Sequence, residues 1–110
     1  MSSKKMDSCI EACQICIEAC ETCSSENKDK AGMEKSVKLC IACIDTCKEL
    51  ITASKNTASN LNELYKKCEE ACSACDNECG SHTNMEHCSV CADACRKCAA
   101  ECKAMLTAQN

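Results

Sequence analysis

Cysteines recur along this chain at alternating steps of three and four residues, and cysteine thiolates are strong ligands for soft metal ions. The sequence holds 17 cysteines in 110 residues. Steps of three and four repeat every seven residues, so each group of cysteines predicts a helix with all its thiols on one face. The four groups are Cys9, Cys13, Cys16, Cys20 and Cys23; Cys40, Cys43 and Cys47; Cys68, Cys72, Cys75 and Cys79; and Cys88, Cys91, Cys95, Cys98 and Cys102.

Four helices are needed to carry these groups, and the remaining composition suits helices. The chain has two glycines, no proline and a single aromatic residue, Tyr65, so it lacks the residues that form β-turns. We expect helices over about 4–24, 33–56, 60–79 and 85–106. The short links between them predict an all-α fold, an antiparallel up-down-up-down four-helix bundle with a cysteine-lined core, built by a single domain over residues 1–110.

Several helix boundaries carry start and stop residues. The polar segment 24–32, SSENKDKAG, separates the first two helices. Asn60 with Glu63 has the spacing of a capping pair, and so does Thr83 with Glu86. Gly80 follows Cys79 and is placed to end the third helix. We therefore expect side-chain caps at these ends.

Apolar residues complete the inner faces. All four helices present cysteine near the first and third links, whereas leucines are expected to seal the opposite end: Leu50, Leu61 and Leu64. A second apolar stripe beside the cysteines predicts either a wider core face or a subunit interface. It consists of Ile10, Ile17, Val37, Ile41, Ile44 and Ile51.

Charge and cysteine usage exclude several classes of function. The net charge is −4 with both signs interspersed, which predicts binding to neither nucleic acid nor a membrane. The start, MSSKKMDSCIEAC, has no apolar run after its lysines, so we expect a cytoplasmic protein whose thiols stay reduced. An odd number of cysteines also prevents complete disulfide pairing within one chain.

Seventeen inward thiols are too many to be explained by packing. Free cysteine packs as a small hydrophobic residue, but leucine would bury more apolar area at almost every one of these positions. Metal binding is the benefit we expect, and an all-thiolate site selects Cu(I), Zn(II) or an iron–sulfur cluster. Zinc and iron–sulfur sites usually use a few cysteines on loops rather than a continuous helical stripe.

Cu(I) suits the pattern for two reasons. It accepts two or three sulfur ligands, so cysteines four residues apart on one helix can hold one ion. One Cu(I) per thiolate also leaves the interior neutral, whereas four thiolates around Zn(II) bury two negative charges. We expect multiple Cu(I) ions, about as many as cysteines, and a bundle that folds without metal.

Three alternatives stay open. A metallothionein-like buffer would bind Zn(II) or Cd(II). A thiol redox enzyme would use one CxxC pair, but no βαβ pattern surrounds any such pair, so we expect a protein that is not an enzyme. A bundle stapled by disulfides would have no free thiols.

The run CSACDNECGSHTNMEHCSVCADACRKCAAECKAM and the segment SCIEACQICIEACETC resemble the bacterial copper storage proteins. The segment from Glu78 to His82, the pair His87 and Cys88, and the unbroken spacing carry the resemblance. It implies a four-helix bundle, commonly a tetramer, that fills its core with Cu(I), and copper ions and a copper chaperone are the candidate partners. The expected second helix departs from the pattern, since Ser36 and Ser54 occupy stripe positions.

The resemblance also implies that metal enters where the first and third links meet. That end holds His82, His87, Met33 and Met85. Imidazole and thioether groups suit relay ligands for copper, so these four join the cysteines as expected metal ligands. Met6 and Met105 belong to the opposite end, where we expect them to pack.

Overall fold

The computed structural model describes residues 4–56 and 58–108, and these form four helices joined by short links. The helices are α1 (Lys4–Asn27), α2 (Glu34–Lys55), α3 (Leu61–Gly80) and α4 (Glu86–Ala108). Their ends lie within three residues of the predicted ones. The all-α prediction is therefore confirmed. The sequence could predict these helices because a period of seven residues is a local signal, which the tertiary structure does not override.

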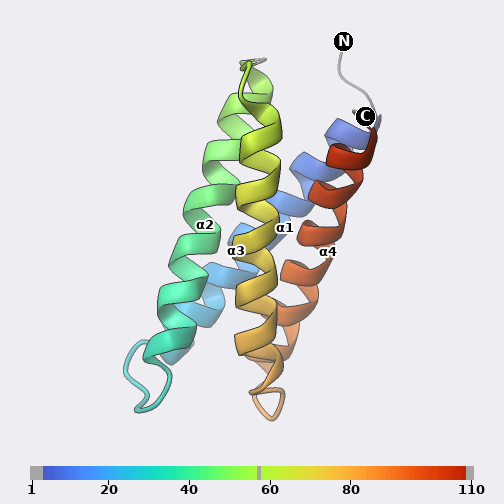
Figure 1. Ribbon diagram of the computed structural model, residues 1–110. Coiled ribbons are helices and arrows are strands. Elements are labelled where there is room, and N and C mark those ends of the chain that lie inside the picture. The colour runs from blue at the N-terminus through green and yellow to red at the C-terminus, as the bar shows by residue number, and fades with distance from the viewer. Residues whose placement is uncertain (1–3, 57, 109–110) are drawn as a thin grey trace.

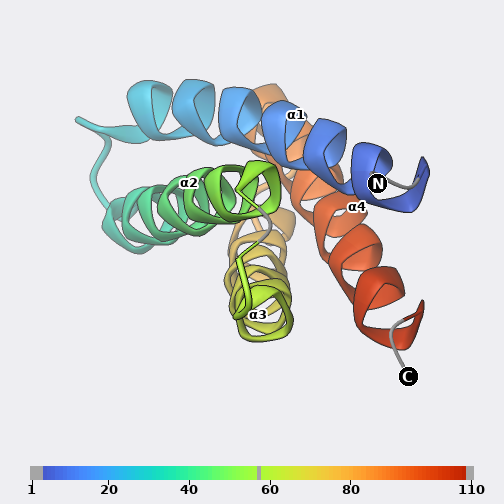
Figure 2. The same cartoon turned by 90° about the horizontal axis from the view of Figure 1, so that it is seen from above.

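The helices run alternately up and down, which places both described ends of the chain at one end of the bundle (Figure 1). The α1–α2 and α3–α4 loops meet at the other end, called the loop end below. Each helix packs against two neighbours, in the cyclic order α1, α2, α3, α4 (Figure 2). The resulting rod measures 45 × 19 × 18 Å and encloses one continuous core.

All 17 cysteines are buried and unpaired, and each is at most 2% exposed. The predicted leucine seal is present at the end opposite the loop end, where Leu50 and Leu64 are buried and Leu61 is partly buried against the core. Tyr65, which sequence reasoning did not place in the core, is fully buried. Met105 is buried and Met6 is partly buried, as packing roles require.

The second apolar stripe divides between core and surface. Ile17, Ile44 and Ile51 pack against the buried core, so they widen it. Ile41 is 49% exposed and contributes to the surface instead. Within the two described ranges, none of the four helices has both the length and the apolar character needed to cross a membrane.

The predicted caps are wrong in detail. Asn60 directly precedes α3, but its side chain makes no capping hydrogen bond. Gly80 is the last residue of α3 rather than its stop, and Ser81 forms the cap. Helix α4 begins at Glu86, two residues later than a box opened by Thr83 requires, and the Met85 carbonyl accepts its first backbone hydrogen bonds. Backbone hydrogen bonds shape these ends, joined at the end of α3 by one side-chain bond, from the Ser81 hydroxyl to the Glu78 carbonyl at 2.7 Å.

Candidate metal centre

The thiols form a continuous column along the axis of the bundle. Helical spacing turns every cysteine inward, and the four helices bring sulfurs from different segments into contact. The Sγ atom of Cys43 on α2 lies 3.4 Å from that of Cys16 on α1 and 3.3 Å from that of Cys72 on α3. Further along the column, the Sγ atoms of Cys40 on α2 and Cys75 on α3 lie 3.7 Å apart. Sulfur therefore meets sulfur across helices along most of the rod.

Groups of four sulfurs lie close enough together to share a metal ion. In each group, all the Sγ atoms are within 4.8 Å of one another and every residue is buried. A metal–thiolate bond of about 2.3 Å places two ligand sulfurs about 3.8 Å apart in a tetrahedral site and about 4.6 Å apart in a linear one. The column thus accepts metal with small side-chain movements. Such groups include Cys13, Cys68, Cys98 and Cys102; Cys16, Cys43, Cys47 and Cys72; and Cys20, Cys40, Cys75 and Cys91.

Sulfur pairs four residues apart on one helix are present, as the spacing predicted: Cys68 and Cys72 lie 3.9 Å apart, and so do Cys91 and Cys95. Cys16 and Cys20 lie 4.0 Å apart, as the single-helix arrangement requires. Cys9 and Cys13 also contact sulfurs of α4, with Cys9 3.9 Å from Cys102 and Cys13 3.6 Å from Cys98. The sites therefore draw on two or more helices, because the alignment of the helices decides which sulfurs meet.

Burial and shared protons control the ionisation of the column. Cys16 and Cys20 share a proton, which lowers the pKa of Cys16 and raises that of Cys20. For Cys9, the hydrogen bond with Cys102 lowers the pKa, but the one with Cys13 and burial raise it, to about 12. Dry surroundings disfavour thiolates, so a cation that binds here must displace protons.

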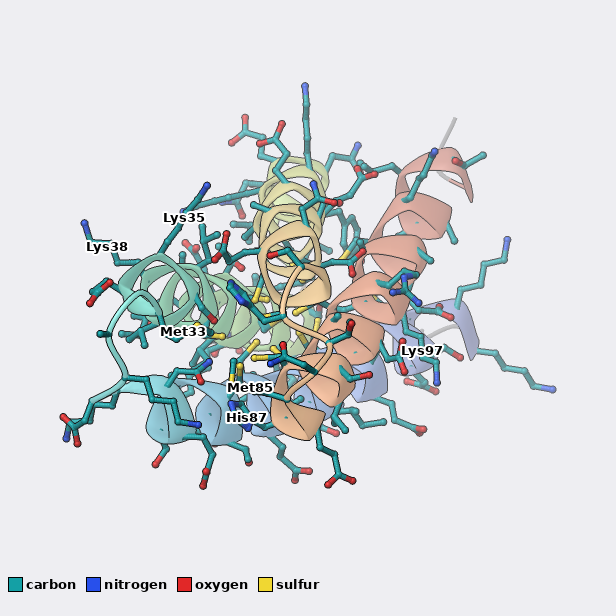
Figure 3. All side chains as sticks on the ribbon, turned by 90° about the horizontal axis from the view of Figure 1, so that it is seen from below. Met33, Lys35, Lys38, Met85, His87 and Lys97 are labelled. Carbon is teal, nitrogen blue, oxygen red and sulfur yellow. The ribbon has the colours of Figure 1, made fainter. Side chains whose placement is uncertain are left out.

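The loop end gathers three of the four predicted relay residues. Met33 is buried, while Met85 and His87 are partly buried, and all three lie around the core sulfurs (Figure 3). Lys35 and Lys38 extend away from the bundle in the same view.

His82 has a different environment from these three residues. Its Nε2 atom lies 3.1 Å from a carboxylate oxygen of Glu78. The structure thus holds His82 toward an acidic side chain rather than toward sulfur.

Two polar residues at this end were missed or undervalued in the sequence. Asn27 was assigned to the polar break 24–32, yet it belongs to α1 and is 1% exposed. Ser36 is fully buried, with its hydroxyl 3.7 Å from the Cys79 sulfur. The missed signal was spacing, since Asn27 follows Cys23 by four residues and continues the inward stripe.

A helical bundle with an axis of free, buried thiols is a multi-site metal-binding bundle. The family model described as copper storage protein matches residues 2–107, and the chain belongs to this family. The apo form of copper storage protein 3 from Bacillus subtilis is similar, with a TM-score of 0.85 and 33% identity over 91% of this chain and 97% of that one. The Cu(I)-bound copper storage protein BsCsp3 has a TM-score of 0.86 and 31% identity, covering 94% of this chain and 99% of that one. No curated protein matches the chain.

Proposed function

We propose that this protein stores Cu(I) at high capacity and thereby limits copper toxicity, with the core thiolates as ligands. The observation that carries the proposal is the unbroken column of 17 buried, unpaired cysteines. Every cysteine sulfur lies within 4.0 Å of another cysteine sulfur, so ions can occupy neighbouring positions along the whole axis. Membership of the copper storage family and similarity to a Cu(I)-bound relative support the same choice of metal.

Charge balance favours Cu(I) over Zn(II), even though the sulfur groups have a size that also suits tetrahedral zinc. Four thiolates around one Zn(II) leave a net charge of −2, and a buried net charge is strongly unfavourable unless a cation compensates it. In the described part of the chain, the buried polar residues are Asn27, Ser36 and Ser54, and none of them is basic. One Cu(I) per thiolate needs no such compensation.

Metal is taken up at the loop end in this proposal. Met33, Met85 and His87 surround the last sulfurs there and are the relay ligands, while His82 beside Glu78 serves as an outer contact. The opposite end is sealed by Leu50 and Leu64.

The protein is passive, not an enzyme, and works in the cytoplasm, where its thiols stay reduced. It assembles as a homo-oligomer, a tetramer, and receives copper from a copper chaperone. The exposed apolar side chains of Ile15, Ile41 and Val90, each about half exposed, are candidate contacts for assembly.

Anaerobic titration of the fully reduced protein with Cu(I), against a competing chelator, tests the function. We expect saturation near one ion per cysteine, with one proton released per ion. Saturation near one ion per four cysteines, with Zn(II) displacing Cu(I), would instead support a zinc buffer. Growth of copper-stressed cells with and without the protein then measures protection.

A further inference from the structure

The sulfur column ends at the loop end in a layer with one side chain from each helix. These side chains are Cys23 of α1, Ser36 of α2, Cys79 of α3 and Cys88 of α4. The Cys23 sulfur lies 3.9 Å from the sulfurs of both Cys79 and Cys88. An ion that comes from the loop end reaches this layer before it reaches the rest of the column.

Asn27 is buried in the bundle one helical turn beyond Cys23, and it covers this layer on the side of the loop end. Its side-chain NH2 group lies 3.3 Å from the Cys23 sulfur, 3.5 Å from the Cys88 sulfur and 3.3 Å from the Ser36 hydroxyl, and its two hydrogens are shared among these three acceptors. At 1% exposure, the amide has no contact with bulk water to compensate for loss of these partners. A buried amide with partners on three helices is held in a single orientation.

The other end of the same amide fixes His87. Asn27 Oδ1 can only accept a hydrogen bond, so His87 Nε2, 2.7 Å away, must carry the proton and donate it. In the neutral ring, Nδ1 then holds the lone pair that can bind a metal. Histidine ligands in metalloproteins usually donate their second ring N–H to an oxygen in this way, which fixes both tautomer and ring orientation.

We propose that Asn27 is a positioning residue for copper uptake, acting through His87. The amide selects the Nε2–H tautomer, so that Nδ1 receives the arriving Cu(I), and it holds Cys23 and Cys88 beside that ring. In transfer into the column, each thiol that binds Cu(I) as a thiolate releases its S–H proton to solvent, and the amide gives up its hydrogen bonds to these sulfurs as the copper–sulfur bonds form. This assignment rests on the proposed Cu(I) storage and adds a residue that the cysteine pattern does not contain.

Two substitutions at Asn27 test the assignment, with a matched control on the surface. Asn27→Leu removes both the carbonyl oxygen and the NH2 group of the amide but keeps a side chain of similar size. Asn27→Ala removes the same groups and also the bulk of the side chain. Asn77→Leu makes the same chemical change at an exposed position of α3. Each reduced protein is checked for helicity and mixed anaerobically with a coloured Cu(I)–chelator complex, and the initial transfer rate and final ions per chain are recorded.

We expect both Asn27 variants to take up copper about 10- to 100-fold more slowly, the usual range for loss of an outer partner of a metal ligand. Saturation should stay at the wild-type level, and Asn77→Leu should match wild type in both measurements. The ¹⁵N shifts of the His87 ring should show one tautomer in wild type and a mixture in the Asn27 variants. In a His87→Gln background, Asn27→Leu should cause no further slowing.

Unchanged rates in both Asn27 variants would overturn the assignment, and so would faster uptake by Asn27→Ala, which would make Asn27 only a steric plug. Slowing that persists without His87 would contradict action through the ring. The ring ¹⁵N measurement needs no copper, so a mixed tautomer in the wild-type protein overturns the assignment by itself. Low Cu(I) saturation of the wild type would instead count against the storage function.

Discussion

Ser36 occupies a position in the stripe of α2 where a cysteine would complete the last sulfur layer. Its side chain is fully buried, with the hydroxyl 3.7 Å from the Cys79 sulfur and 4.0 Å from the Cys23 sulfur. Ser36→Cys would therefore place a new sulfur in contact with two existing ones. The change tests whether capacity follows the number of connected thiols.

The expected gain follows from charge balance. One added thiolate is neutralised by one added Cu(I), so capacity should rise by about one ion per chain, with about one more proton released. Serine and cysteine differ only in an oxygen atom replaced by sulfur, and Ser36 is fully buried. We therefore expect the fold to tolerate this small change.

Ser54 supplies a control on the same helix. It is buried at 5% exposure near the opposite end, and none of the sulfur contacts described above involves it. Ser54→Cys adds a thiol of the same type without joining the column. We expect its capacity to stay at the wild-type value.

The assay is anaerobic Cu(I) titration of the three reduced proteins side by side, with thiol counts taken before each run. If Ser54→Cys gained an ion as readily as Ser36→Cys, capacity would depend on cysteine number alone. If neither gained one, thiolate charge would not set the capacity. Either result would refute the reasoning from a connected, charge-balanced column.

Three other predictions concern the metal-free bundle. The Tyr65 hydroxyl is buried without a hydrogen-bond partner among residues 4–56 and 58–108, so Tyr65→Phe should raise the free energy of unfolding in urea by about 1 kcal/mol; a loss of stability would contradict this. In the folded state Cys9 keeps its proton up to a pKa of about 12, whereas in the unfolded chain its pKa is near 9.0. The free energy of unfolding should therefore fall as pH rises between these two values, and urea titrations that show a rise would refute this prediction. Removal of all copper with a strong Cu(I) chelator should leave the far-ultraviolet helical signal intact, because neutral thiols pack as small apolar groups; loss of that signal would show that metal is needed for folding.

Much of the fold was readable from the sequence because its main signal is local. The alternation of threes and fours places every thiol of a group on one helical face, whatever the partner helices are. The details of the helix ends were harder to predict from the sequence. Asn60 and Gly80 have the right residue types for a cap and a stop, but the backbone geometry of the links uses neither in that way.

The core composition was predicted only in part. Tyr65 was noted as the single aromatic residue, and its side chain is buried at the end sealed by leucines. Asn27 was assigned to a polar link, although it extends the stripe of Cys23 by one turn. Polar residue types argue for a surface position when taken alone, and a partner such as His87, 60 residues away, is needed to show why burial is tolerated.

The sequence alone determined that this protein is a bundle of four helices with inward thiols, since a heptad period needs no knowledge of the partner helices. Only the tertiary structure decided which sulfurs meet, as with Cys43 between Cys16 and Cys72. It also decided that His87 bonds to Asn27, whereas His82 bonds to Glu78. The physical reason is that the alignment of helices along the axis depends on packing between segments far apart in the chain, and local spacing carries no record of it.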